Sequence, residues 1–383
     1  MESREYCNKH IFTKLTCQDS VLADRRVCDE HLGKAWKRWI GQSSVLVMRL
    51  SPDRRFNSEH AIATLMTPIA ALVPRRPNVL IVGGTAGIGA ALAKKLALQL
   101  PSTAHITIAG RSSDAAAAVI ADIRQYGSID ARDHGSHHPV LDFAQVDCAS
   151  MSDVKRFCEQ YQQQLEPGAS LDILILTPGI LSMKGWTPAT LNSTIDHKLA
   201  LHFYARMLII RELGPVLSKR AIVVSVLDGK NSNAHDKAIM SDDLALSQPG
   251  HYGLRSAMRH SIAMTDIMMQ YFASSAVPHA TFIHAYPGFV ATSTFHNPAL
   301  PLFFRLGLRV LSSLFATSPA ECADRLLEGI VNAHRLTLDS ASGGEWCGLD
   351  CGTVVRKCPV DEAIVERVRA HTWQLVDAQV GGA

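Results

Sequence analysis

The stretch at residues 78–92, NVLIVGGTAGIGAAL, constrains the fold of this chain more than any other. An apolar run at residues 79–82 leads into a turn that contains Gly83, Gly87 and Gly89, and an amphipathic segment follows. This order predicts a buried strand, a tight turn and a helix whose N-terminal N–H groups bind phosphate. Glycines permit the turn and let the backbone approach a pyrophosphate closely. The stretch therefore predicts dinucleotide binding, and the alternative is a glycine-rich turn without a ligand.

The composition is that of a folded globular protein. Of 383 residues, 47% are hydrophobic and 19% are charged, and the net charge of +3 gives no case for a nucleic-acid partner. Nine cysteines at scattered spacings indicate reduced thiols, so we expect a cytoplasmic protein without a bound metal. The apolar stretch at residues 300–315 is too short and too charged to span a bilayer. It suits a lid over an apolar substrate, a packing helix, a contact in a homo-oligomer or a peripheral membrane contact.

The chain divides into two parts by pattern. Residues 1–76 mix charges, three cysteines and isolated apolar residues without a sustained period, which predicts a poorly ordered N-terminal extension. Within it, residues 34–50 could form a basic amphipathic helix on a membrane surface, although an unevenly charged tail is the simpler interpretation. Residues 77–383 alternate short apolar runs with helical patterns, as in βαβ units. The predicted fold class is α/β, a single doubly wound parallel sheet with helices on both faces.

Six strands are expected, at residues 79–82, 106–109, 143–146, 173–176, 222–226 and 281–285. Helices are expected to begin near Gly87, Ser113, Ser152, Ala189, Tyr252 and Pro319, and a last helix is expected at residues 360–376. Helices between successive strands provide the right-handed connections that parallel neighbours need.

Four motifs occur in an order that is typical of one enzyme family. They are the loop at residues 82–89, Asp147 after the third expected strand, Gly179 in the turn at residues 176–179, and PGFVAT at residues 287–292. From about residue 77 to 377 the chain resembles a short-chain dehydrogenase/reductase. The resemblance implies a Rossmann-type fold and a bound nicotinamide cofactor. It implies cofactor contacts from Gly83, Thr85, Gly87, Ile88, Gly89, Asp147, Gly179, Tyr252, Val290 and Thr292.

Arg111 bears on which cofactor is bound. It follows the second expected strand, where an acid would hydrogen-bond the ribose hydroxyls of NAD and a cation would accept the 2′-phosphate of NADP. The next acid along the chain is Asp114. We therefore predict NADP (NADPH) with Arg111 as a cofactor-binding residue, and the alternative is an exposed arginine at a strand end.

The resemblance also implies a catalytic tyrosine, a lysine that lowers its pKa and a serine that hydrogen-bonds the substrate oxygen. Tyr252 and Ser225 match the first and last of these, but Ser256 stands where the lysine is expected, one residue after Arg255. A phenol with a pKa of about 10 is a poor base at neutral pH, so a cation is needed nearby. We predict Tyr252, Ser225 and Arg255 as the catalytic residues, with Arg255 supplying charge but no proton.

Other departures from the family pattern occur together. The structural asparagine of the family is replaced near residues 196–198, and Lys198 could extend toward the empty lysine position, although a solvated helix lysine is the simpler interpretation. A branch of fungal reductases linked to specialised metabolism resembles this chain in several segments. These lie at residues 83–85, 199–204, 242–244, 260–266 and 284–288. In that branch the residue three positions after the tyrosine is often basic, which supports Arg255.

Two functions of different class follow. The favoured one is an NADP-dependent oxidoreductase that reduces a carbonyl, or oxidises an alcohol, of an apolar small molecule in fungal secondary metabolism. The altered residues around Tyr252 favour the alternative, a catalytically impaired NADP-binding scaffold or redox-responsive interaction protein. Isomerisation or dehydration is a third possibility, because a fold does not determine chemistry.

Overall fold

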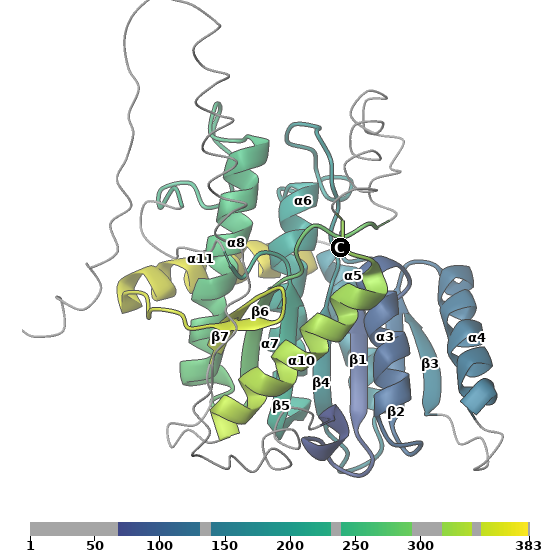
Figure 1. Ribbon diagram of the computed structural model, residues 1–383. Coiled ribbons are helices and arrows are strands. Elements are labelled where there is room, and N and C mark those ends of the chain that lie inside the picture. The colour runs from purple at the N-terminus through teal and green to yellow at the C-terminus, as the bar shows by residue number, and fades with distance from the viewer. Residues whose placement is uncertain (1–67, 131–138, 231–238, 293–315, 339–345, 382–383) are drawn as a thin grey trace, which may run out of the picture. The chain divides into compact units, whose positions relative to one another are not determined.

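The computed structural model describes residues 68–130, 139–230, 239–292, 316–338 and 346–381. These residues form an eight-stranded sheet in the order β3-β2-β1-β4-β5-β6-β7-β8 (Figure 1). The strands are β1 (Asn78–Val82), β2 (His105–Gly110), β3 (Val140–Gln145), β4 (Leu171–Leu176), β5 (Leu217–Val226), β6 (Thr281–Tyr286), β7 (Trp346–Asp350) and β8 (Thr353–Val355). Strands β1 to β7 pair in parallel, and β8 is antiparallel to β7. The predicted doubly wound α/β fold is confirmed, with two more strands than expected.

Helices cover both faces of the sheet (Figure 1). One face packs against α3 (Gly87–Gln99), α4 (Ser113–Asp130) and α10 (Pro319–Leu338). The other packs against α5 (Met151–Gln164), α7 (Ala205–Leu213), α8 (Leu254–Tyr271) and α11 (Glu362–Gly381). Side chains alternate along β1, so Val79 and Ile81 join the first core and Leu80 and Val82 join the second. A strand that is buried on both faces gives a continuous apolar run, as the sequence has at β1.

The helix expected near Ala189 begins later, so that prediction is wrong. The first helical turn is α6 (His197–Leu199), which continues through the π-helical turn η2 (Ala200–Tyr204) into α7. Asp196 determines the start, because its side chain accepts hydrogen bonds from the backbone N–H groups of Lys198 and Leu199. Before it, Pro188 and Asp196 form an antiparallel bridge, which closes a turn over the residues between them.

Part of the predicted N-terminal extension packs with the domain. Ile69, in the short helix η1 (Ile69–Ala71), is 1% exposed and belongs to the same core as Val79. Residues 1–67 and the apolar stretch at residues 300–315 lie outside the described residues.

A buried ionic cluster connects the segment after β8 to the centre of the molecule. Nδ1 of His284 in β6 donates to Asp266 of α8 over 2.6 Å, and Nζ of Lys357 lies 3.0 Å from the other oxygen of that carboxylate. The Asp266 and Lys357 side chains are 1% and 6% exposed. Lys357 also donates to the carbonyl of Gly229, in the loop after β5. Removal of either charge would leave the other buried without its counter-charge, which is destabilising.

Candidate cofactor and catalytic site

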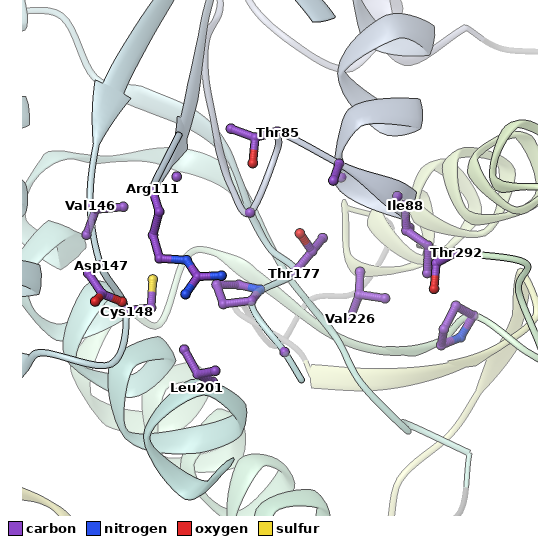
Figure 2. Close-up of a pocket in the computed structure, with 18 residues that line it drawn as sticks. Thr85, Ile88, Arg111, Val146, Asp147, Cys148, Thr177, Leu201, Val226 and Thr292 are labelled. Carbon is purple, nitrogen blue, oxygen red and sulfur yellow. The ribbon is translucent and has the colours of Figure 1, made fainter. Parts of the chain in front are cut away.

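A cavity of about 400 Å³ lies where the parallel strands end (Figure 2). Most of its lining comes from the last residues of β2 and β5, the loops that follow β1, β2, β3, β4 and β6, and the first turn of α3. The lining residues are Gly83, Thr85, Ala86, Gly87, Ile88, Gly89, Gly110, Arg111, Val146, Asp147, Cys148, Thr177, Pro178, Gly179, Leu201, Val226, Pro287 and Thr292. Open α/β sheets bind their ligands at this edge, outside the carboxyl ends of the strands.

The loop between β1 and α3 fits a phosphate group. Gly83 has a φ of 84°, and a Cβ on Gly89 would collide with the carbonyl oxygen of Gly83. Helix α3 can therefore begin this close to the turn only because both positions are glycine. Its N-cap residue, Ala86, gives no side-chain hydrogen bond, so the N–H groups of the first turn are left for a ligand. A pyrophosphate bound there would meet several N–H donors and the positive end of the helix dipole.

Arg111 and Asp147 lie on one side of the cavity, and Ile88 and Thr292 lie on the other (Figure 2). Arg111 is exposed and extends into the open space. The carboxylate of Asp147 accepts a hydrogen bond of 3.1 Å from the N–H of Ala149, which fixes its direction. Among the residues that line the cavity, Arg111 carries the one guanidinium and Asp147 the one carboxylate. This end can therefore bind a phosphate through Arg111 and a polar group through Asp147.

The structure brings together most of the residues that the sequence suggested for the cofactor. Of that set, only Tyr252 and Val290 do not line the cavity, and Val290 is buried. Cys148, Leu201 and Val226 also line it and were missed. Single apolar residues next to strand ends or in a helix give no sequence signal that separates them from the core.

Tyr252 lies outside the cavity lining and is hydrogen-bonded to a carboxylate. Its hydroxyl donates to Oδ1 of Asp196 over 2.7 Å, and Asp196 is 1% exposed. Burial, together with the hydrogen bond to Asp196 and its charge, raises the pKa of Tyr252. A phenol with a raised pKa keeps its proton at neutral pH. In this arrangement Tyr252 is held in its protonated form, and it is neither a good acid nor a good base while Asp196 accepts its hydrogen bond.

Lys198 is the cation that the structure places beside Tyr252. Its Nζ lies 5.3 Å from the centroid of the Tyr252 ring, and the residue is 3% exposed. The ammonium group donates to the carbonyl of Lys184 over 2.8 Å. Burial lowers the pKa of Lys198, and the charge of Asp196 opposes that change. The interpretation of Lys198 as a solvated helix lysine is therefore wrong. Arg255, by contrast with the buried Lys198, is exposed on the first turn of α8.

Ser225 is near the end of β5, as expected, but it is 0% exposed and does not line the cavity. Its Oγ accepts a hydrogen bond of 2.7 Å from Nη1 of Arg206, a residue that the sequence analysis missed. The available signal was a charged residue inside the apolar run at residues 203–210, because buried charges in such runs need specific partners.

His251, next to Tyr252, also has a carboxylate partner. Its Nδ1 donates to Oδ2 of Asp243 over 2.9 Å, and the same carboxylate accepts hydrogen bonds from the backbone of Ser247 and Gln248. His251 is therefore hydrogen-bonded to Asp243, just as the neighbouring Tyr252 is hydrogen-bonded to Asp196.

Comparison with known proteins identifies the family of this chain. Residues 77–238 match the short chain dehydrogenase family. The chain is 31% identical to Oxidoreductase AN1596 of Emericella nidulans over 266 residues, which covers 67% of this chain and 73% of that protein. The chain belongs to the short-chain dehydrogenase/reductase family. The resemblance to this family that the sequence motifs indicated is confirmed.

Other relatives of this short-chain dehydrogenase/reductase are also fungal. Oxidoreductase andH of Emericella variicolor is 31% identical over 217 residues, covering 55% of this chain and 57% of that protein. The short-chain dehydrogenase/reductase SAT2 of Stachybotrys chartarum is 27% identical over 273 residues, covering 67% and 71%. Among solved structures, that of gox2181 has 17% identity and a TM-score of 0.49, covering 74% of this chain and 98% of that chain.

Within the described ranges of this short-chain dehydrogenase/reductase family member, no helix has the length and apolar character needed to cross a membrane. In the same ranges, His, Cys, Asp and Glu side chains do not gather in groups of three or more that could hold a metal ion.

Proposed function

We propose that this protein is an NADP-dependent oxidoreductase that interconverts a carbonyl and an alcohol of an apolar small molecule, in a pathway of fungal secondary metabolism. One observation carries the proposal: the glycine turn before α3, Arg111 and Thr292 line a single cavity at the carboxyl ends of the strands. Fungal relatives whose names say oxidoreductase support the reaction class. Bound NADPH would supply the hydride.

Each part of the cavity has a role in this proposal. The N–H groups at Gly87 and Gly89 hold the pyrophosphate, since the start of α3 offers donors without helical partners. Arg111 pairs with the 2′-phosphate, and Asp147 contacts the adenine at the same side. Thr292, on the opposite side, contacts the nicotinamide amide.

Tyr252 is the proposed proton donor to the substrate oxygen. To reach the cavity its hydroxyl must release Asp196, which now accepts its hydrogen bond. Donation of the proton leaves a phenolate, and the nearby ammonium of Lys198 favours that charged form. Lys198 thus takes the role of the missing family lysine in preference to Arg255, which is exposed. Ser225 takes part through its position near the end of β5, where its Oγ accepts a hydrogen bond from Arg206.

The present contacts of Tyr252 and Ser225 favour a second candidate function. Tyr252 is bonded to Asp196, Ser225 is bonded to Arg206, and neither residue lines the cavity. A protein that binds NADP without turnover, and acts as a scaffold or a redox-responsive partner, would need no more than the cavity provides.

Titration of the full chain with NADPH and NADH, followed by nicotinamide fluorescence, tests the cofactor. We expect NADPH to bind about tenfold more tightly or better, because a charge-assisted phosphate pair contributes about 1.5–3 kcal/mol. Arg111→Ala should remove this preference, and Arg367→Ala, at an exposed arginine of α11, should keep it. Equal affinity for both cofactors would contradict the NADP assignment.

A screen of apolar ketones and aldehydes for NADPH oxidation then separates the two candidate functions. Oxidation with any of them supports the oxidoreductase. Tight NADPH binding with no oxidation across the panel supports the scaffold.

A further inference from the structure

Resting on the proposed function, we propose that Arg206 is the fixed positive charge of the cofactor site. It is a positioning residue that hydrogen-bonds to three parts of the cavity lining. From its buried position behind that lining, its charge would stabilise the negative charge of the bound cofactor.

The guanidinium of Arg206 connects segments that are far apart in the sequence. Nη1 donates to Oγ of Ser225 over 2.7 Å and to the carbonyl of Val226 over 2.9 Å. Nη2 donates to the carbonyl of Pro178, and Nε donates to the carbonyl of Leu201 over 3.2 Å. Pro178, Leu201 and Val226 all line the cavity. Arg206 therefore lies directly behind the lining, at the point where β4, β5 and η2 meet.

The charge of Arg206 has no counter-ion in the described part of the chain. Its hydrogen-bond acceptors are three carbonyls and one hydroxyl, all neutral, and the residue is 1% exposed. Burial lowers the pKa of Arg206 to about 10, so it is a cation at neutral pH. The buried Lys357, by contrast, has the carboxylate of Asp266 at 3.0 Å.

An unpaired buried charge is costly, so its retention calls for compensation. A dinucleotide in the adjacent cavity brings phosphate charges of the opposite sign. Arg206 is buried, and the interactions of a buried charge are stronger than those of a charge in solvent. The charge of Arg206 then favours the loaded protein over the empty one, in addition to the geometric effect of its four hydrogen bonds.

Two substitutions separate the charge from the hydrogen bonds. Arg206→Gln removes the charge but keeps a donor, and Arg206→Lys keeps a charge that can titrate, because burial lowers the pKa of lysine. The readouts are NADPH affinity from fluorescence between pH 7 and 9, and thermal unfolding of the free protein. We expect Arg206→Lys to bind within about threefold of wild type at pH 7 and about tenfold more weakly by pH 9. Wild type should change much less over that range.

Salt provides a second discriminating readout, with exposed Arg111 as the matched comparison. We expect Arg206→Gln to bind NADPH about tenfold more weakly, and this deficit should persist from low to high salt because a buried charge is screened little. The deficit of Arg111→Ala should shrink as salt rises, since an exposed pair is screened.

The outcomes are distinct. Wild-type affinity in Arg206→Gln, with only a lower unfolding temperature, would show that Arg206 is a structural tie and overturn the proposal. If Arg206→Gln does not fold, Arg206→Lys decides, and a pH profile parallel to that of wild type overturns the proposal. Failure of the wild-type protein itself to bind NADPH would instead overturn the proposed function, and this role with it.

Discussion

The cavity and the Tyr252 cluster, which consists of Tyr252, Asp196 and Lys198, differ in how their polar groups are satisfied. In the cavity, the helix start at Gly87 and the exposed side chain of Arg111 are left available to a ligand. In the Tyr252 cluster, the hydroxyl, the carboxylate and the ammonium group are already hydrogen-bonded within the protein. One region is ready to bind, and the other must rearrange before it can transfer a proton.

This difference shows that cofactor binding and catalysis depend on separate parts of the molecule. Binding relies on backbone geometry that glycines create. Proton transfer relies on a side chain whose pKa is raised by burial and by its present partner, Asp196. Substitutions in one region should therefore leave the other largely unchanged.

The largest expected effect is on turnover in Tyr252→Phe. With a carbonyl that the wild type reduces, we expect kcat to fall about 100-fold or more, because a positioned proton donor contributes 10²–10⁴-fold. NADPH affinity should stay within about twofold, since Tyr252 does not line the cavity. Steady-state kinetics and fluorescence titration measure the two quantities. Tyr271→Phe, later on α8, is the control, and unchanged turnover in Tyr252→Phe would exclude Tyr252 as the proton donor.

A smaller effect in the opposite region is expected from Gly89→Ala. The added Cβ would collide with the carbonyl of Gly83, so the turn must shift, and we expect NADPH affinity to fall about 10- to 100-fold. Gly185→Ala is the matched control, because a Cβ there meets nothing within 4 Å. Isothermal titration calorimetry gives both affinities. Equal affinities for the two variants would show that the phosphates do not bind at this turn.

The smallest effect concerns stability at alkaline pH. The raised pKa of Tyr252 means that the folded protein keeps a proton that the unfolded chain loses above about pH 10, so stability is present below that pH and falls above it. One such group changes the free energy of unfolding by up to about 1.4 kcal/mol per pH unit. Urea unfolding between pH 8 and 11 should show a shallower fall in Tyr252→Phe than in wild type. Identical slopes would contradict the contact with Asp196.

The sequence was a good guide where backbone pattern determines structure. Strand β1 and the turn at Gly83 follow from an apolar run and glycine spacing, and all six expected strands are present. Strand β7 was missed because WCGLD has neither a continuous apolar run nor a clear alternation. Its Gly348 is needed because a Cβ would meet the carbonyl of Gly229 and the side chain of Lys357.

Side-chain partners in the catalytic region could not be predicted in the same way. Asp196 precedes Tyr252 by 56 residues, and Arg206 precedes Ser225 by 19. Neither pair has a spacing that a periodic pattern would reveal, because loops and helices of variable length separate the partners. Burial of Lys198 also depends on where the helix begins, which Asp196 determines by capping it.

The ion pair between Lys357 and Asp266 has a consequence for how the protein is made. Asp266 is almost fully buried in α8, and within the described residues its lysine partner comes from the segment that follows β8. A nascent chain that has not yet emerged as far as Lys357 carries this carboxylate without its counter-charge. Because a buried charge without its counter-charge is destabilising, we expect the packing around Asp266 to be less stable during synthesis until the segment that carries Lys357 has left the ribosome.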